Sequence, residues 1–271
     1  MDLAGSRVFY GGRTRPGENV IELYQFAFSH FCEKARWALD FKGIAYRPVN
    51  LLPGMHIGTV KKIAPKSHLP VLVNGTSIVQ DSPAIITYLD GIQAEPALTP
   101  LDAQELREAL EWERYLDEEI GVTLRLWFYH HALPDRDLAL GFILEGAPWY
   151  RRWVFRLIFP GVRAAMLKYM NINAQTAMRA QERLLAALDR IDAALQKGNF
   201  LVGKRFTRAD LCACALLSPF CLPDDDALTK RFPAAVVALR KQHTARPVFA
   251  WVRKIYAEYR RPSNSHQLSS A

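Results

Sequence analysis

The chain has 271 residues, of which 50% are hydrophobic, and a formal net charge of +8 at pH 7. This length suits one large domain or two of ordinary size with a sizeable core. Four cysteines do not indicate a disulfide scaffold, and no apolar run is long enough for a transmembrane helix, so we expect a reduced, cytoplasmic protein. The net charge is positive, but the sequence contains no nucleic-acid-binding motif. We therefore interpret the charge as a local basic patch and not as a sign of nucleic-acid binding.

The N-terminal third alternates strands with helices. Residues 1–19 lack the apolar core of a signal peptide and are predicted to be a flexible extension. Apolar periodicity predicts strands at 20–26, 45–51, 69–73 and 77–80, and helices at 30–41, 55–63 and 82–89. Asn74 and Gly75 are a strong hairpin signal between the last two strands. The resulting order over 20–92 is β-α-β-α-β-β-α, a compact α/β layer.

The rest of the chain is predicted to be all-helical, over residues 102–261, after a proline-containing linker at 93–101. Helices are expected at 175–195 and 248–259, and Thr207 with Asp210 forms a capping box that begins another. The predicted buried face of the first long helix consists of Leu106, Leu110, Leu116, Ile120 and Leu124. The Ser-rich tail 262–271 is predicted to be disordered. The fold class is therefore α+β with two domains.

Four stretches carry a family resemblance: FSHFCEKARWAL, APKSHLPVLV, QDSPAIITYLD and FLVGKRFTRADL. In this order and spacing they resemble the motifs of the soluble glutathione transferases. The closest resemblance is to a bacterial branch with a Ser-x-x-Cys turn, in the chi-like or omega-like groups. It implies a thioredoxin-like N-terminal domain, an all-helical C-terminal domain, glutathione as co-substrate, no metal and a homodimer.

Ser29 and Cys32 stand at the predicted start of a helix. A helix N-terminus offers free N–H groups and a partial positive charge, which favour a thiolate. Because residue 29 is serine, the reactive sulfur can come from glutathione, and the Ser29 hydroxyl can donate a hydrogen bond to it. An ordinary helix cap is the alternative for Ser29. Cys32 is expected to be a small buried side chain, with a mixed disulfide to glutathione as its alternative. By resemblance, Tyr24 is a second candidate for stabilising the thiolate, but its position five residues before Ser29 favours a packed strand residue.

The resemblance also implies three anchors for glutathione. Leu69 precedes the expected cis-proline, Pro70, and offers its backbone groups to the cysteinyl part of the tripeptide. Asp81 is expected to pair with the γ-glutamyl ammonium, while Ser82 and its helix N-terminus receive the neighbouring carboxylate. His68 stands where many relatives have a lysine for the glycine carboxylate.

The histidine at position 68 weakens the expected anchor for the glycine carboxylate. An unperturbed histidine is mostly neutral at pH 7, so it supplies less positive charge than a lysine. Lys66 and His56 are further candidates to compensate, and the sequence alone does not choose between them.

An acceptor site is expected between the two domains. Its candidates are His30, Phe31, Trp127, Phe128 and Tyr129, for which core packing is an equally good explanation. The expected function is conjugation of the glutathione thiolate to a small apolar electrophile. The alternatives are a thiol reductase or peroxidase that uses Cys32, and a non-catalytic protein that binds ligands with the same fold.

Charge is distributed unevenly along the helical part. Residues 102–119 carry eight acids and two arginines, whereas 149–170 carry five basic residues and no acid. Attraction between these blocks would favour the homodimer. Pro160 and Gly161 argue against one continuous helix over 149–170. We expect this segment to pack over the acceptor site, ahead of contact with a partner subunit and, third, contact with an anionic membrane surface.

Overall fold

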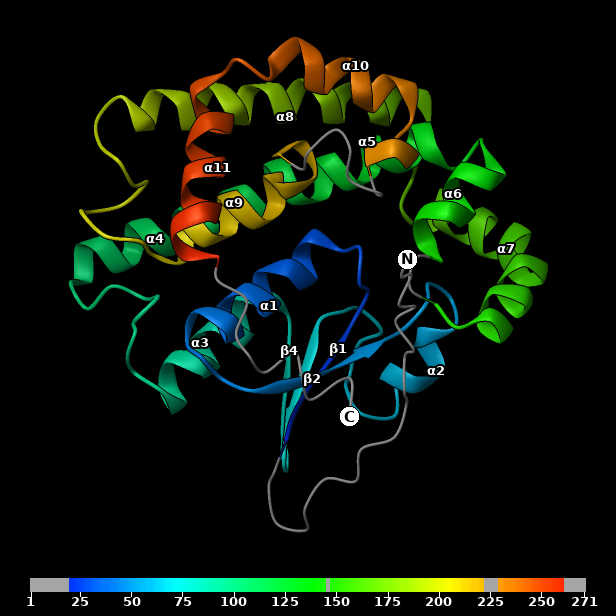
Figure 1. The fold of residues 1–271 in the computed structure, drawn as a ribbon, viewed down its shortest axis with the longest axis horizontal. Coiled ribbons are helices and arrows are strands. Elements are labelled where there is room, and N and C mark those ends of the chain that lie inside the picture. Colours follow the sequence, from blue (N-terminus) through cyan, green and yellow to red (C-terminus); the bar gives the residue numbers. More distant parts are fainter. Residues whose placement is uncertain (1–19, 145–146, 222–228, 261–271) are drawn as a thin grey trace, which may run out of the picture.

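The computed structural model describes residues 20–144, 147–221 and 229–260 (Figure 1). The expectations for the extension 1–19 and the tail 262–271 lie outside these residues. A mixed sheet with helices is followed by a helical region, which confirms the predicted fold class. Within the described part of the chain, no helix is both long and apolar enough to cross a membrane.

The sheet has the strand order β2–β1–β3–β4. Strand β1 (Ile21–Gln25) pairs in parallel with β2 (Tyr46–Asn50) and antiparallel with β3 (Val71–Asn74). The predicted hairpin leads from β3 into β4 (Ser77–Gln80). Gly75 has a φ of 58°, the left-handed conformation that such a tight turn requires.

Three helices complete the first domain: α1 (His30–Phe41), α2 (His56–Val60) and α3 (Ser82–Ile92). Ser29 caps α1, and the side chains of Cys32, Ala35 and Leu39 are fully buried, as the helical spacing predicted. Helix α1 lies between the sheet and the helical domain (Figure 1) and packs against both α3 and α9. The N-terminus of α1 is thereby placed at the junction of the two domains.

The helical domain surrounds a core that is continuous with that of the first domain. A π-helical turn, η1, joins its first two helices into one run. The elements are α4 (Ala103–Leu116), η1 (Asp117–Val122), α5 (Thr123–Ala132), α6 (Arg136–Ile143), α7 (Trp149–Tyr169), α8 (Ala174–Leu195), α9 (Arg208–Cys221), the short turn η2 (Thr229–Arg231), α10 (Ala234–His243) and α11 (Pro247–Tyr259).

The buried face of α4 differs from the predicted one. Leu106 is half-buried and Leu110 is exposed, while the other three predicted positions are buried. Ala109 and Glu113 take the inner positions instead. Glu113 is tolerated there because Arg208 forms an ion pair with it at 2.7 Å. A hydrophobic pattern does not reveal a buried carboxylate whose partner lies far along the chain.

The expected interruption at Pro160 was wrong, because α7 runs through it as one helix. Proline lacks the N–H that would bond to the carbonyl of residue 156, four positions earlier. In the structure the Arg136 guanidinium donates to the Arg156 carbonyl oxygen at 3.3 Å. This side chain from α6 replaces the missing backbone donor and removes part of the cost of an internal proline.

Candidate active site

A cavity of about 1230 Å³ lies between the first domain and the helical domain. Residues 26–31 at the start of α1 form one wall, together with the loop at 67–69. Side chains of α5, α7 and α9 form the opposite wall, so residues far apart in the sequence meet here. Most of the lining is apolar, which suits the binding of an apolar molecule.

Ser29 lies at the N-terminus of α1 and on the cavity wall. Its Oγ accepts a hydrogen bond from the backbone N–H of Cys32, with an N–O distance of 3.3 Å. Because that oxygen acts as an acceptor in the cap, the hydroxyl proton is left to donate elsewhere. The helix dipole adds positive potential at the same place, so the site is suited to an anion.

Cys32 and Tyr24 are not among the described residues that line the cavity. Cys32 is fully buried, and burial is the main reason that the pKa of its thiol is raised. The Tyr24 hydroxyl donates to Glu22 at 3.0 Å, and its ring packs beside a small separate cluster around Val60 and Val71. Both side chains therefore occupy packed positions outside the cavity.

The segment before α3 carries the predicted glutathione anchors. The Leu69–Pro70 peptide bond is cis, as expected, and Leu69 lines the cavity. Asp81 has a φ of 89°, a conformation that is strained for residues other than glycine. The next residue, Ser82, is fully buried, and its Oγ has no hydrogen-bond partner. A buried hydroxyl without a partner costs free energy that a bound carboxylate would recover.

His68 and Asp81, assigned to opposite ends of glutathione, lie together in the structure. The Nε2 atom of His68 is 3.4 Å from an Asp81 carboxylate oxygen, and both side chains are largely exposed. The Gln80 side chain fixes the backbone of Lys66, because it accepts from the Lys66 N–H and donates to the Lys66 carbonyl oxygen. His68 is thus directed to a carboxylate of the chain itself.

His56 lines the cavity, and its ring lies near the backbone of Leu52 and Ser67. Its Nδ1 atom is buried and has no partner in hydrogen-bond geometry. The imidazole packs edge-on against Phe26, with 4.9 Å between ring centroids. Burial lowers the pKa of His56, so the ring is neutral at pH 7 and can donate one hydrogen bond.

The predicted acceptor residues divide into two groups. His30, Phe31 and Tyr129, together with Phe128, line the cavity. Trp127 does not belong to the lining, because it packs toward α8, where its indole N–H donates to Gln181 at 3.2 Å. The alternative expectation of core packing describes Trp127 correctly.

His30 is fixed by the π-helical turn. The His30 Nε2 atom lies 3.0 Å from the carbonyl oxygen of Gly121, so that nitrogen carries the proton. Burial, followed by the positive charge of Arg125, lowers the pKa of His30 to about 3. Gly121 has no side chain, and a Cβ atom there would lie 2.4 Å from the Phe31 ring. The glycine thus allows η1 to approach the start of α1 closely.

A chain of aromatic contacts crosses the apolar part of the cavity. Phe28 contacts Phe142 with ring centroids 4.8 Å apart, and Phe142 contacts Phe128 at 4.9 Å. Phe128 in turn meets Phe232 at 5.6 Å. Sequence reasoning did not assign Phe28, Phe142 or Phe232 to the cavity, although Phe28 is the first residue of the FSHFCEKARWAL stretch; no local motif marks the other two. It did not name the lining residues Arg125, Phe220 and Arg253, whereas Val162 and Met166 belong to the segment 149–170 that was expected to pack over the acceptor site.

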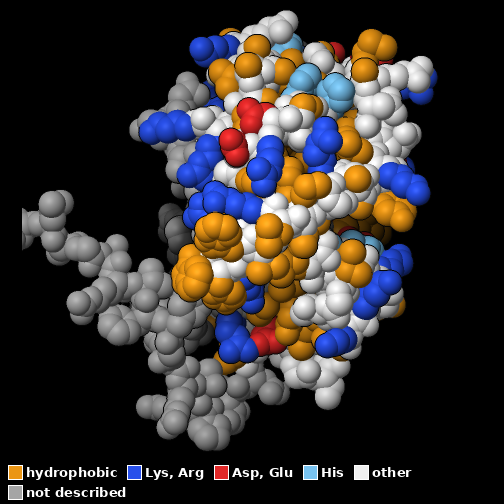
Figure 2. Space-filling view, turned by 90° about the vertical axis from the view of Figure 1, so that its right-hand side faces the viewer, with side chains coloured by type: hydrophobic (Ala, Val, Ile, Leu, Met, Phe, Trp, Pro, Cys, Tyr) orange, Lys and Arg blue, Asp and Glu red, His pale blue; other side chains and the backbone are white. Residues whose placement is uncertain are grey.

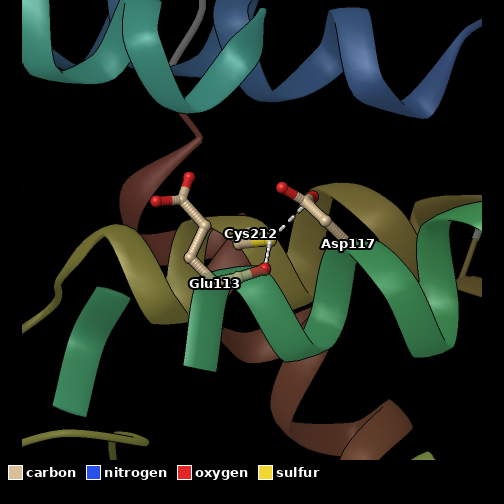
Figure 3. Close-up of side chains that lie close together, drawn as sticks. All are labelled: Glu113, Asp117 and Cys212. Carbon is tan, nitrogen blue, oxygen red and sulfur yellow. Dashed lines mark hydrogen bonds between the residues drawn. The ribbon is translucent and has the colours of Figure 1, made fainter. Parts of the chain in front are cut away.

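Glu113, Asp117 and Cys212 bring three potential metal ligands within 4.8 Å of one another (Figure 3). The Lys34 ammonium lies beside them, 2.7 Å from Asp117 and 3.1 Å from Glu113. Lys34 and Arg208, which pairs with Glu113 at 2.7 Å, therefore already supply the two positive charges that balance these carboxylates. The cluster is explained as an ion-pair network between α1, α4, η1 and α9. The expectation that no metal is needed stays a prediction.

Sequence comparison identifies the family to which this fold and site belong. Residues 23–97 match the family described as "Glutathione S-transferase, N-terminal domain". Residues 154–247 match "Glutathione S-transferase, C-terminal domain". The two domains of one family thus occur in order along the chain, and the chain belongs to the glutathione S-transferase family, a family of enzymes. The predicted family is confirmed, whereas the chi-like or omega-like sub-class stays a prediction.

Individual relatives are more distant. Glutathione S-transferase Z1 of Arabidopsis thaliana is 32% identical over 145 residues, which cover 46% of this chain and 65% of that protein. Glutathione S-transferase TCHQD of the same plant is 28% identical over 216 residues, covering 75% and 78%. A glutathione S-transferase of Ceriporiopsis subvermispora, solved in complex with glutathione, has a TM-score of 0.60 at 18% identity and covers 91% of this chain and 100% of that chain. That structural likeness supports the fold alone.

Proposed function

We propose that this protein is a glutathione transferase in which the Ser29 hydroxyl stabilises the thiolate of bound glutathione. The observation that carries the proposal is the position of Ser29, at a helix N-terminus that opens onto a large apolar cavity. A hydrogen bond to the thiolate lowers the pKa of the thiol, so more of it is ionised at neutral pH. The chain itself forms no covalent bond in this mechanism.

The chain's own residues fit the parts of glutathione. The unpartnered Ser82 hydroxyl, at the N-terminus of α3, suits the γ-glutamyl carboxylate, and Asp81 suits its ammonium. Leu69, before the cis-proline, offers backbone groups to the cysteinyl part. His56 is our preferred donor to the glycine carboxylate, because it lines the cavity and has a ring nitrogen without a hydrogen-bond partner, while His68 contacts Asp81.

The acceptor is proposed to be an apolar, aromatic electrophile. The aromatic chain from Phe28 to Phe232 offers ring faces and edges for it. Positioning thiolate and electrophile in one apolar cavity converts a bimolecular encounter into a reaction within a complex. The alternative that uses Cys32 gains no support from this geometry, because the thiol is buried and its pKa is raised.

The test compares Ser29→Ala with Ser29→Thr, which keeps a hydroxyl. We expect Ser29→Ala to lower kcat/KM with chlorodinitrobenzene about tenfold to a hundredfold, since a hydrogen bond to a charged group contributes ~1.5–3 kcal/mol. The pKa of the bound glutathione thiol, followed by thiolate absorbance, should rise in parallel, and Ser29→Thr should retain part of the effect. Equal rates and equal thiol pKa values in all three proteins would refute the assignment.

We also propose that the protein is a cytoplasmic homodimer. The charge argument for the dimer is weaker than the sequence implied, because acids of the 102–119 block form ion pairs within the chain. Glu113 and Asp117 pair with Lys34, and Glu119 pairs with Arg183 at 2.7 Å. We therefore expect a dimer whose sedimentation coefficient changes little with salt.

A further inference from the structure

The outer face of α7 presents large apolar side chains to solvent. Trp149, Trp153 and Leu157 are 76%, 64% and 78% exposed. They recur every four residues, so they lie on one face of the helix, with the exposed Tyr150 and Val154 beside them. Figure 2 views the side of the molecule where α7 lies and shows hydrophobic side chains gathered there with Lys and Arg around them.

The same helix is strongly basic. Residues 149–170 carry five basic residues and no acid. Arg152, Arg156 and Arg163 are spaced by four and seven residues, which places them in a row along one flank of the apolar face. Arg151 stands on the other flank. The outer face of α7 therefore combines exposed aromatic rings with positive charge on both sides.

The inner face of α7 holds the helix in place without these side chains. Phe155 and Phe159 are buried in the core, and Val162 and Met166 line the cavity. Trp149, Trp153 and Leu157 are neither buried nor part of the cavity lining. The fold and the proposed catalytic site therefore do not account for them.

We propose that α7 docks on the surface of an anionic lipid bilayer. Tryptophan and tyrosine rings favour the boundary between headgroups and acyl chains, and arginines attract anionic headgroups. A second copy of this face is a poor alternative, because a two-fold contact would bring the arginine rows of both copies together. Because the opposite side of α7 lines the cavity, docking would place the acceptor site about one helix diameter, ~10 Å, from the headgroups.

Co-sedimentation of the full chain with vesicles tests the proposal. We expect binding to vesicles of phosphatidylcholine mixed with phosphatidylserine, and little binding to phosphatidylcholine alone. The variant Trp149→Ser/Trp153→Ser/Leu157→Ser should reduce the partition coefficient at least tenfold. Arg152→Gln/Arg156→Gln should reduce it about thirtyfold, since each arginine near an anionic surface contributes ~1 kcal/mol, which is about fivefold.

The matched control is Leu101→Ser, which removes an apolar side chain that is 86% exposed outside α7. It should bind vesicles as the wild type does. Circular dichroism and conjugation activity without lipid show whether each variant is folded. Equal binding to neutral and anionic vesicles, or full binding by the folded triple variant, would overturn the proposal. The proposal would also be overturned if the triple variant changed mainly from a dimer to a monomer in sedimentation without lipid. In that case α7 would be a subunit interface.

Discussion

At the scale of single residues, His30 gives the protein a defined sensitivity to acid. Its pKa is lowered to about 3 in the folded state, whereas an unfolded histidine titrates near pH 6.5. Between these values the unfolded chain binds more protons, so stability falls as the pH decreases and levels off near pH 3. We expect His30→Gln to lose less of its unfolding free energy than the wild type between pH 7 and pH 5, by about 1–2 kcal/mol.

Denaturant unfolding at the two pH values measures this difference. Glutamine keeps an N–H donor for the Gly121 carbonyl, so the variant tests titration more than the loss of a hydrogen bond. Asp210 titrates in the opposite sense, because burial raises its pKa to about 6, but it contributes equally to both proteins. Parallel stability profiles for variant and wild type would contradict the role given to His30.

At the scale of elements, α7 depends on a side chain from another helix. Arg136 of α6 donates to the carbonyl that Pro160 leaves without a backbone donor. We expect Arg136→Ala to destabilise the protein by about 0.5–1 kcal/mol, and to do so less when Pro160→Ala restores the backbone N–H. Urea unfolding of the wild type, the two single variants and the double variant measures the coupling free energy between Arg136 and Pro160. Effects of each alanine on the unfolded chain cancel in this double-mutant cycle. Strict additivity would show that the Arg136 contact does not compensate for the proline.

The elements that sequence reasoning predicted well are those with local signals. The Ser29 cap, the Asn74–Gly75 hairpin and the capping box at Thr207 and Asp210 each satisfy nearby backbone groups, so their consequences are local. In the structure Asp210 accepts hydrogen bonds from the backbone N–H groups of Leu201 and Thr207. The continuous α7 was missed because its compensating donor comes from a different helix.

The candidate site was predicted most completely in its first-domain half, although Phe128 and Tyr129 of α5 were also expected and line the cavity. Ser29, Leu69 and Pro70 belong to local motifs, whereas the opposite wall depends on how α5, α7 and α9 pack. Trp127 was assigned to the cavity by resemblance, together with its neighbours Phe128 and Tyr129. Neighbouring residues of a helix point in different directions, so Phe128 and Tyr129 line the cavity while Trp127 faces α8.

At the scale of the whole molecule, Lys34 connects the two domains. Its ammonium is fully buried and contacts Glu113 and Asp117 across the domain boundary. We expect Lys34→Met to destabilise the protein by about 3–5 kcal/mol, because two carboxylates lose a buried partner. Burial already raises the pKa of Asp117, and without Lys34 it should rise further. Protonation then relieves the unpaired charge, so the loss should be larger at pH 8 than at pH 5.

Calorimetry and denaturant titration measure this loss. Lys42→Met is the matched control, because Lys42 is equally buried but pairs with Asp90 within the first domain and its linker. Both variants should be less stable than the wild type. Only for Lys34→Met should this loss of stability increase between pH 5 and pH 8, because Asp117 ionises over that range and has no partner. The opposite pH trend for Lys34→Met would contradict the ion-pair explanation of the cluster.

The ion cluster of Lys34, Glu113 and Arg208 also decides whether the chain can be divided. Cutting at the linker would leave Lys34 on one fragment and its carboxylates on the other. Arg208, which also bonds to Thr87 and to the Pro83 carbonyl of the first domain, would lose those acceptors. Each fragment would then expose charged groups set within a freshly uncovered apolar surface. Neither domain is therefore expected to fold on its own, and the two should be stable only when they are expressed as a single chain.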